Sequence, residues 1–419
     1  MESNMQNQTM ELDLIGQYYA SIINHKQSGV FALCVHLTER LNPQVLQQAA
    51  NDLMCRLPFL NGRLRRGFFH YKFEILKAPP EIRPAGNGPL FCDYYNSGSR
   101  HMINIIYGER DFTVRTTHSI CDGRGLSKIT AALLVRYFEL LGVTMADRGD
   151  IIDCAMPFQA EEAENAYERF VEKRPAKLAK KREAAGEAGV YHPKYAKSAS
   201  QQVLTKLFDG GKLKVQSKAH GVTITEYILA KIFEGVRQER EAAGEKKPIS
   251  AMIPVDCRSF FPSKTLRSFV SSANITMPET KDFSDMLQEI AVQFREISQE
   301  CMQADINELQ NMYHSARYVP RVLKAWFMRL IARSESAGQT TGFSNLGRIQ
   351  LPREIESRVA RFEFSISLEH DTPYFFSCVT VGNALAFTAS FREEGRKVVE
   401  AVMEGLEDLC QKHRHVERI

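Results

Sequence analysis

The sequence predicts an α/β protein with mixed sheets. Both halves of the 419-residue chain combine β-rich runs with amphipathic helical runs, and several strands follow one another without a helix between them. Such adjacent strand pairs argue against a doubly wound dinucleotide-binding fold, in which helices separate the strands. No repeat of short period is present, which excludes a solenoid. Apolar residues make up 44% and charged residues 25%, the composition of an ordinary globular protein.

In the first half, strands and helices alternate along the chain. Residues 1–10 are polar and expected to be frayed, and the apolar run 29–37 predicts a buried strand. Asn42 is a favourable N-cap and Pro43 a favourable first helical residue, so a helix is predicted from there to just before Pro58. A hairpin follows, with strands at 102–107 and 112–117, and then a second helix over about 125–141.

The composition changes between about residues 160 and 200, which is the best linker candidate. The segment 173–182 holds six basic residues, followed by Ala, Glu and Gly with little β-branching. We interpret it as a solvated crossover, with a phosphate-binding strip as the alternative. The predicted organisation is an N-terminal lobe over 1–172, a linker over 173–200 and a C-terminal lobe over 201–419.

The second half begins again with a helix. Thr223 and Glu226 form a capping box that opens a helix to about Glu239. A strand is predicted over 249–255 and is followed by Asp256-Cys257-Arg258. Two amphipathic helical stretches are predicted next, at 283–302 and at 305–334, the second with a break at Pro320. Three strands follow at 361–368, 374–381 and 384–391, and a final helix is predicted over 394–413.

Charge, cysteine usage and hydropathy exclude several classes of protein. The net charge is +4, from 54 basic and 50 acidic residues, so no basic field favours nucleic acid. Nine cysteines without a CxxC pair predict reduced, mostly buried thiols rather than a disulfide framework or zinc site. The first twelve residues do not form a signal peptide, and no apolar run reaches the about 18 residues that span a membrane. We therefore predict a cytoplasmic protein without a membrane span.

Motifs for several common chemistries are absent from the sequence. It contains no GxxxxGK[ST] loop for nucleotide phosphates, no GxGxxG after a strand, no GxSxG hydrolase turn and no HExxH zinc pair. The search for a functional site therefore turns to less common constellations.

The best candidate for chemistry is the run Thr116-Thr-His118-Ser-Ile-Cys-Asp122-Gly-Arg-Gly125. It lies between a predicted strand end and a helix start, where a side chain can face a cleft. The imidazole of His118 suits a general base that takes a proton from a hydroxyl or amine near neutral pH. Asp122 can turn back toward the same loop, and Gly123 permits a tight turn. The alternative is structural, with His118 a satisfied buried residue and Asp122 a helix cap.

This run resembles the HxxxDG motif of the chloramphenicol-acetyltransferase-like superfamily. That group includes condensation domains of peptide synthetases, plant acyltransferases and alcohol acetyltransferases, and the bacterial alcohol-acetyltransferase type is the most similar. Further segments resemble family patterns in the family's order: Arg56-Leu-Pro-Phe-Leu60 with Arg63, Pro254-Val-Asp-Cys-Arg258, Arg267-Ser-Phe-Val with Asn274, and Gly342-Phe-Ser-Asn-Leu-Gly347. Together the matches cover about residues 11–391.

The resemblance implies a fold and a mechanism. The fold would be two similar α/β lobes with mixed sheets, joined in a V with a tunnel between them. His118 would be the general base that activates an acceptor for attack on an acyl thioester, in a ternary complex. Asp122 would be structural and ion-paired with Arg258.

The resemblance also implies substrate-binding residues. Ser344 and Asn345 are candidates for stabilising the oxyanion of a tetrahedral intermediate, with Asn274 behind them. Gly123 would line the same site. For Ser344 and Asn345 the alternative is a turn before Leu346-Gly347.

Departures from the family narrow the expected function. The residue before His118 is Thr117 where many members have a second histidine, and the DFGWG motif of the plant branch is absent. With no fused carrier or adenylation domain within 419 residues, the expected co-substrate is acyl-CoA, and the acceptor a small alcohol or amine. No metal or tightly bound cofactor is implied, because the thioester is already activated. A free acyl-carrier protein as donor and a non-catalytic thioester-binding homologue stay open, and we expect a monomer.

Two lesser features complete the sequence analysis. The segment 63–71 mixes cations with aromatics, and we interpret it as a surface strand and turn rather than a nucleic-acid surface. Trp326 and Phe327 are interpreted as core or tunnel wall. Core packing is also the preferred interpretation of three methionines, with a methionine-lined acyl pocket as the alternative: Met302, Met312 and Met328.

Overall fold

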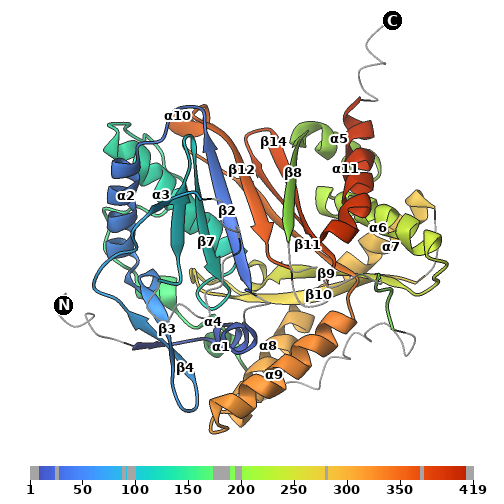
Figure 1. Ribbon diagram of the computed structural model, residues 1–419, viewed down its shortest axis with the longest axis horizontal. Coiled ribbons are helices and arrows are strands. Elements are labelled where there is room, and N and C mark those ends of the chain that lie inside the picture. Colours follow the sequence, from blue (N-terminus) through green and yellow to red (C-terminus); the bar gives the residue numbers. More distant parts are fainter. Residues whose placement is uncertain are drawn as a thin grey trace, which may run out of the picture.

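The computed structural model is a mixed α/β protein with two lobes (Figure 1). It describes residues 9–23, 28–86, 91, 101–172, 189–193, 201–278, 282–368 and 372–411. Within them the strands form one five-stranded, one six-stranded and one three-stranded sheet. The α/β class with mixed sheets, predicted from the sequence, is confirmed.

The N-terminal lobe is built on the five-stranded sheet, in the order β12-β2-β7-β6-β5. Its strands are β2 (Val30–Leu37), β5 (Arg83–Pro84), β6 (Asn104–Tyr107), β7 (Asp111–Thr117) and β12 (Val359–Ile366). The helices α2 (Pro43–Arg56) and α3 (Gly123–Leu140) cover one face of the sheet and share its apolar core. A small antiparallel sheet, in the order β1-β4-β3, extends this lobe: β1 (Thr9–Glu11), β3 (Gly62–Arg66) and β4 (Tyr71–Ile75).

The C-terminal lobe is built on the six-stranded sheet, in the order β10-β9-β11-β13-β14-β8. Its strands are β8 (Gln202–Asp209), β9 (Ile249–Asp256), β10 (Val270–Met277), β11 (Thr341–Ile349), β13 (Tyr374–Val381) and β14 (Ala384–Phe391). The helices of this lobe that share its apolar core are α5 (Gly210–Ala219), α6 (Ile224–Ala242), α7 (Phe283–Arg295) and α11 (Arg396–Gln411).

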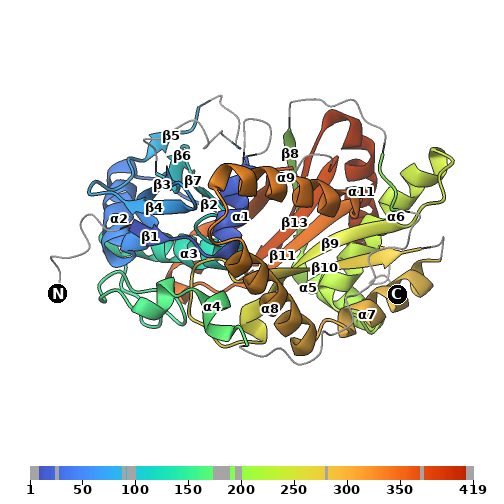
Figure 2. The same cartoon turned by 90° about the horizontal axis from the view of Figure 1, so that it is seen from below.

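Three helices lie across the region where the lobes meet: α1 (Leu14–Ile22), α8 (Gln299–Ser315) and α9 (Arg321–Ala337). Figure 2 shows α8 and α9 crossing the molecule beside α1, and α1 packs against α9 and α8. Two short helices complete the set: α4 (Ala166–Phe170) and α10 (Arg353–Glu356).

Local sequence signals placed several elements correctly. The strand predicted over 29–37 is β2, the helix capped by Asn42 is α2, and the 102–117 hairpin is the antiparallel pair β6–β7. The helix predicted over about 125–141 is α3. The capping box of α6 is present, since Thr223 Oγ1 accepts a hydrogen bond from Glu226 N at 3.2 Å and Thr223 N donates to Glu226 Oε2 at 2.6 Å.

The strand predicted over 361–368 lies in an unexpected place. The other two strands of that group, β13 and β14, pair with each other, but β12 pairs antiparallel with β2 in the N-terminal sheet. Phe362 and Phe364 of β12 are buried in the N-terminal core, which explains the pairing. The C-terminal part of the chain therefore contributes a strand to the N-terminal lobe. The predicted linker falls mostly on 173–188 and 194–200, outside the described residues, and the lobe boundaries stay predictions.

The helical stretches predicted over 283–302 and 305–334 are divided differently. There are three helices, because Ser298 caps α8 by accepting a hydrogen bond from Cys301 N at 3.4 Å, and α8 then continues to Ser315. The break at Pro320 is correct, since this residue precedes α9. Polar caps of this kind interrupt a helical run without interrupting its apolar periodicity.

Strands β10 and β11 were missed for different reasons. β10 alternates polar and buried apolar residues over 272–277, a strand signal that the sequence analysis overlooked. β11 carries Gly, Ser and Asn and lacks such an alternation. The prediction that residues 1–10 are frayed is wrong for Thr9 and Met10, which pair with β4, and residues 1–8 lie outside the description.

Seven cysteines of the described part are free thiols. Three are buried, three are half-buried and Cys55 is exposed, so the expectation of mostly buried thiols is only partly met. Among the described residues, no helix is long and apolar enough to cross a bilayer.

Gly125 tests how tightly α3 joins the two halves of the chain. A Cβ atom built there lies 2.1 Å from the backbone oxygen of Leu266, so Gly125→Ala forces a backbone shift. We expect a loss of about 1–3 kcal/mol of unfolding free energy in urea titrations. The matched control is Gly405→Ala on α11, whose Cβ meets only the flexible Lys231 side chain at 3.7 Å. Equal stability of the two variants would contradict this assignment.

Candidate active site

His118 lies directly after β7, in the turn that leads into α3. Thr117 fixes this turn, because its carbonyl accepts a hydrogen bond from Ile120 N at 3.0 Å and its Oγ1 accepts one from Ser119 N at 3.3 Å. The hydroxyl of Ser268, from the other half of the chain, donates to the His118 carbonyl at 3.0 Å. The backbone that carries the imidazole is therefore held from both lobes.

Two aromatic rings clamp the imidazole. Tyr19 of α1 stacks on it, with ring centroids 4.6 Å apart and planes at 25°, and Phe31 of β2 packs at 4.5 Å. Nδ1 of His118 is buried and has no hydrogen-bond partner among the described residues. His118 also lines a cavity.

The surroundings of His118 keep it neutral. Burial lowers its pKa to about 4, and the nearby Asp122 carboxylate raises the pKa by less than burial lowers it. An imidazole with such a pKa is unprotonated at neutral pH and available to accept a proton.

Asp122 is completely buried and is the N-cap of α3. Its Oδ1 accepts a hydrogen bond from Gly125 N at 2.7 Å, and its Oδ2 accepts one from Phe269 N at 2.8 Å. The ion pair implied by the resemblance is present, since Arg258 Nη1 lies 2.9 Å from Asp122 Oδ2. The carboxylate thus joins the start of α3 to the segment that leads into β10. It is both a helix cap, the structural alternative, and an ion-pair partner.

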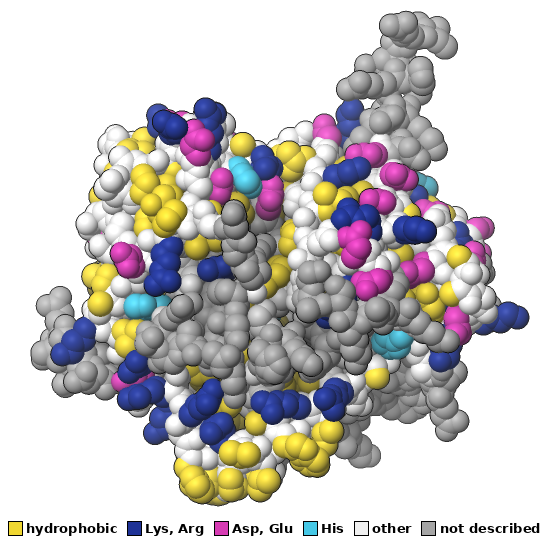
Figure 3. Space-filling view, viewed as in Figure 1, with side chains coloured by type: hydrophobic (Ala, Val, Ile, Leu, Met, Phe, Trp, Pro, Cys, Tyr) yellow, Lys and Arg dark blue, Asp and Glu magenta, His cyan; other side chains and the backbone are white. Residues whose placement is uncertain are grey.

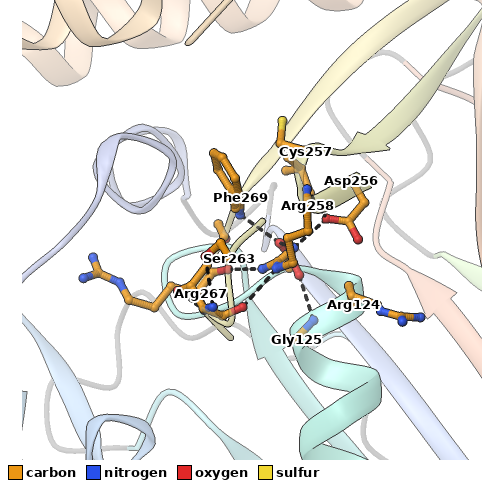
Figure 4. Close-up of polar contacts among 12 residues, drawn as sticks. Arg124, Gly125, Asp256, Cys257, Arg258, Ser263, Arg267 and Phe269 are labelled. Atoms are coloured by element: carbon orange, nitrogen blue, oxygen red, sulfur yellow. Dashed lines mark hydrogen bonds and ion pairs between the residues drawn. The ribbon is translucent and has the colours of Figure 1, made fainter. Parts of the chain in front are cut away.

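Arg258 uses its whole guanidinium group in this network. Nη1 also contacts Asp256 Oδ1 at 2.8 Å, Nε donates to Thr265 O at 2.9 Å, and Nη2 donates to Arg267 O at 2.6 Å (Figure 4). Burial lowers the pKa of Arg258, but the carboxylates of Asp122 and Asp256 raise it above its ordinary value. The guanidinium is therefore a permanent cation that binds the loop 256–269 together.

The same network reaches the ring that covers His118. Arg267 Nε lies 3.1 Å from Asp13 Oδ2, and both side chains are buried. Asp13 in turn caps α1 by accepting a hydrogen bond from Gly16 N at 2.7 Å. Because α1 carries Tyr19, the ion pairs fix both the loop of His118 and the ring stacked on it.

A cavity of about 1400 Å³ lies between the lobes. One face of β9 lines it through alternate residues, while the opposite face of β9 lies in the C-terminal core, as the period of two requires. Met302, Met312 and Met328 of α8 and α9 also line the cavity, so the methionine-lined pocket, rather than core packing alone, describes them. The N-terminal lobe contributes Phe31 and His118.

The structure places the other predicted site residues around this cavity. Gly123, Asn274, Ser344 and Asn345 all line it. Asn274 and Gly342 are both register partners of Met252, and Ser344 follows Gly342 by two residues. The turn alternative for Ser344 and Asn345 is wrong, because both lie on β11.

These polar residues differ in how their side chains are engaged. Asn345 Nδ2 donates to Thr225 Oγ1 at 2.9 Å and its Oδ1 accepts from Gly347 N at 2.8 Å, so it supports the irregular end of β11. Asn274 Oδ1 is buried without a hydrogen-bond partner among the described residues.

The predicted reason for Gly123 is wrong. It begins α3 and is not among the glycines with positive φ. Glycine instead gives space, because a Cβ atom would lie 2.7 Å from Leu346 Cδ2, at the end of a flexible side chain, and 3.5 Å from Phe364 Cζ. Gly123 therefore allows α3 to approach β11 and β12 at the cavity wall.

Sequence analysis missed Tyr19 and Phe31, and α1 altogether. The available signal was Asp13 three residues before Gly16, a helix cap beside a residue small enough to approach the Ser119 carbonyl. No group of three or more His, Cys, Asp or Glu side chains that could hold a metal ion occurs within the described residues.

Comparison with known proteins supports the fold assignment. No protein-family model matches the chain, and a search of the curated proteins finds no match. Among solved structures, the polyketide synthase associated protein 5 from Mycobacterium tuberculosis is similar, with TM-score 0.62 and 15% identity over 95% of this chain and 96% of that one. The condensation domain of the Monacolin K polyketide synthase gives TM-score 0.59 and 13% identity over 96% and 97%. The chain has the condensation-domain fold.

A third similar structure is that of an acetyltransferase. The trichothecene 15-O-acetyltransferase from Fusarium sporotrichioides gives TM-score 0.60 and 10% identity over 98% of this chain and 96% of that one. The two-lobed fold expected from the HxxxDG resemblance is therefore confirmed. At these identities the likeness concerns the fold, and the chemistry must be argued from the site.

The buried ion pair gives a stability prediction. Asp122→Asn removes the buried one of the two carboxylates that pair with Arg258 and leaves only the more exposed Asp256, so we expect a loss of about 3 kcal/mol of unfolding free energy, the lower end for breaking a buried ion pair. Urea unfolding at neutral pH measures the loss. The control is Glu109→Gln, which breaks the pair with Arg40 on the surface, where both side chains are more than half exposed. A change at Asp122 as small as that at Glu109 would show that the pair is dispensable.

The lowered pKa of His118 gives a pH prediction. Because its pKa is about 4 when folded and about 6.5 when unfolded, the unfolded chain binds the proton more tightly, and stability falls as the pH drops through this window. From pH 7 to pH 5 this group should cost about 2 kcal/mol. Urea titrations at both pH values should show a smaller decrease in His118→Gln. An identical decrease in the variant would contradict the buried, neutral imidazole.

Proposed function

We propose that this chain is an acyltransferase that moves an acyl group from acyl-CoA to an alcohol or amine. The observation that carries the proposal is the imidazole of His118, clamped by Tyr19 and Phe31, at the wall of a cavity between two lobes. His118 has no hydrogen-bond partner on Nδ1 within the described part, and its lowered pKa of about 4 leaves it unprotonated at neutral pH.

The reaction follows from these properties. His118 takes the proton from the acceptor hydroxyl or amine while the oxygen or nitrogen attacks the thioester carbonyl. The tetrahedral intermediate then collapses, the carbon–sulfur bond breaks, and the leaving thiolate takes the proton from the imidazolium. No acyl-enzyme forms, so both substrates must occupy the cavity together. Burial disfavours the imidazolium, which promotes return of the proton to the leaving group.

Two polar groups that line the cavity from the C-terminal sheet are the proposed oxyanion partners. Asn274 and Ser344 line the cavity from β10 and β11. Asn274 pairs with Met252 of β9 from one side, and Gly342, two residues before Ser344, pairs with Met252 from the other. We assign the amide of Asn274 and the hydroxyl of Ser344 to this role, because the side-chain amide of Asn345 is already hydrogen-bonded to Thr225 and Gly347.

The size and lining of the cavity fit two substrates. A volume of about 1400 Å³ exceeds the roughly 300–1,000 Å³ typical of pockets for one small ligand. The methionines of α8 and α9 provide adaptable apolar surface for an acyl chain.

A carrier-bound donor is the second candidate. It is favoured by the likeness to a polyketide synthase condensation domain, whose name places it within a synthase. Both donors present the same thioester to His118, so they must be compared directly. A monomeric state, a cytoplasmic location and the absence of a tightly bound cofactor stay predictions.

The experiment is thiol release from a panel of acyl-CoA donors with pooled alcohols and amines. We expect release that requires an acceptor and falls about 10²–10⁴-fold in His118→Ala. The control is His220→Ala, an exposed histidine that does not line the cavity, which should keep the rate.

The outcomes separate the candidates. Release from CoA that depends on His118 establishes the proposed activity. Release only from acyl-carrier protein, again dependent on His118, moves the assignment to the carrier-dependent reaction. Acyl-CoA binding without any His118-dependent turnover would leave a non-catalytic thioester-binding protein.

A further inference from the structure

An exposed apolar patch lies on α9 and the turn between β3 and β4. We define the apolar patch as Phe68, Phe69, Val322, Leu323, Trp326 and Phe327. Phe68 is 74% exposed, Val322 68% and Trp326 63%. Figure 3 shows hydrophobic side chains gathered at the lower edge of the molecule, over α9. The interpretation of Trp326 and Phe327 as core or tunnel wall is therefore wrong.

Helix α9 is apolar on two faces, which is unusual for a surface helix. Its inner face is used, since Ala325 and Ala332 are buried and Met328 and Ile331 line the cavity. The patch residues follow at helical spacing on the outer face, and Leu330, 40% exposed, continues the same row. A contiguous patch of this kind marks an interaction surface.

The turn and the helix form one unit. Arg321 Nε donates to Gly67 O at 3.0 Å, and Arg321 N donates to Phe68 O at 2.9 Å. Lys324 Nζ lies 3.1 Å from His70 Nδ1. The tip carrying Phe68 and Phe69 is therefore fixed beside the N-terminal half of α9, and the apolar patch is preformed.

The helical side of the patch is bordered by positive charge. The segment 317–334 holds five basic residues and no acidic residue. They are Arg317, Arg321, Lys324, Arg329 and Arg333. In Figure 3 a band of Lys and Arg side chains runs directly above the hydrophobic side chains. The first acid after them, Glu335, accepts a hydrogen bond from Tyr18 of α1 at 2.8 Å and lines the cavity.

We propose that this surface docks the protein onto an anionic lipid bilayer. Trp, Phe and Leu side chains on one face, with Lys and Arg beside them, are the pattern of helices that lie in a membrane interface. The apolar patch would enter the acyl region while the cations meet lipid phosphates at the headgroup level. Phe68 and Trp326 stand outward rather than line a groove, which suits a fluid phase that needs no complementary shape.

Other occupants fit these observations less well. A second copy of the chain would bring two sets of five cations together across an apolar interface, with no acid on either segment to pair them. A protein partner requires shape complementarity, and the most exposed side chains here project from the surface.

Docking would also place the cavity against the bilayer. Phe69 belongs to the patch and also lines the cavity. Tyr71 and Arg321, at the junction of the turn and α9, line the cavity beside it. Under the proposed acyltransferase function, on which this step alone rests, an apolar substrate dissolved in lipid would enter there. The docking itself requires no activity and is tested without any.

The test uses the full chain and vesicles of phosphatidylcholine, with or without about a third of phosphatidylglycerol. Trp326 is the sole tryptophan and lies in the apolar patch, so its fluorescence reports directly on insertion. We expect sedimentation with the anionic vesicles, a blue-shifted emission, and binding about tenfold or more weaker on phosphatidylcholine alone. Raising the salt concentration should weaken the anionic component.

Two sets of variants keep the test independent of folding. Phe68→Ser with Leu323→Ser and Phe327→Ser should lower vesicle affinity about 10²-fold, because three exposed side chains lose their apolar contact with lipid. The matched control is Leu207→Ser with Val215→Ser, which removes exposed apolar side chains of β8 and α5 outside the patch. The control should bind like the wild type, and circular dichroism should show both variants folded.

Each outcome decides the proposal. Blue-shifted emission and sedimentation that the patch variant loses and the control keeps support docking on lipid. No partition into either vesicle, or equal partition of the patch variant, overturns it. Dimerisation in solution, or binding to an acidic acyl-carrier protein, that requires the patch while vesicle binding is absent would assign the surface to that partner. Failure of acyl transfer with vesicle binding intact would affect only the proposed function.

Discussion

The buried ion pair between Asp122 and Arg258 is the interaction on which the site depends. Its carboxylate accepts hydrogen bonds from the backbone of Gly125 and Phe269 as well as from the guanidinium, so three separate segments converge on one charge. A buried carboxylate is tolerated only when its partners are this complete. The loop between β9 and β10 and the start of α3 are fixed together for that reason.

This constraint passes to the imidazole in two ways. The turn before Asp122 sets the backbone of His118, and Ser268 beside Arg267 holds its carbonyl. Arg267 meanwhile pairs with Asp13, which caps the helix that places a ring over the imidazole. Polar interactions therefore position a base that itself lies among aromatic rings. The same enclosure lowers its pKa, so position and protonation state have one physical origin.

Helix α9 links the cavity to the outside of the molecule. Its inner face supplies cavity wall, while its outer face is apolar and exposed, and the segment 317–334 carries cations without an acid. The same helix therefore bounds the cavity on one side and exposes aromatic rings, including the sole tryptophan of the chain, on the other.

The sequence by itself determined the α/β class, the capped helices α2 and α6, the β6–β7 hairpin and the HxxxDG turn, because caps, turns and apolar periodicity act within a few residues. It also indicated Arg258 as the partner of Asp122, through resemblance rather than spacing. The tertiary structure alone decided that β12 joins the N-terminal sheet, that α1 stacks Tyr19 on His118, and that Trp326 faces outward. These features depend on which surfaces meet in space, and an apolar helix looks the same in sequence whether its faces meet a core, a cavity or the surroundings of the protein.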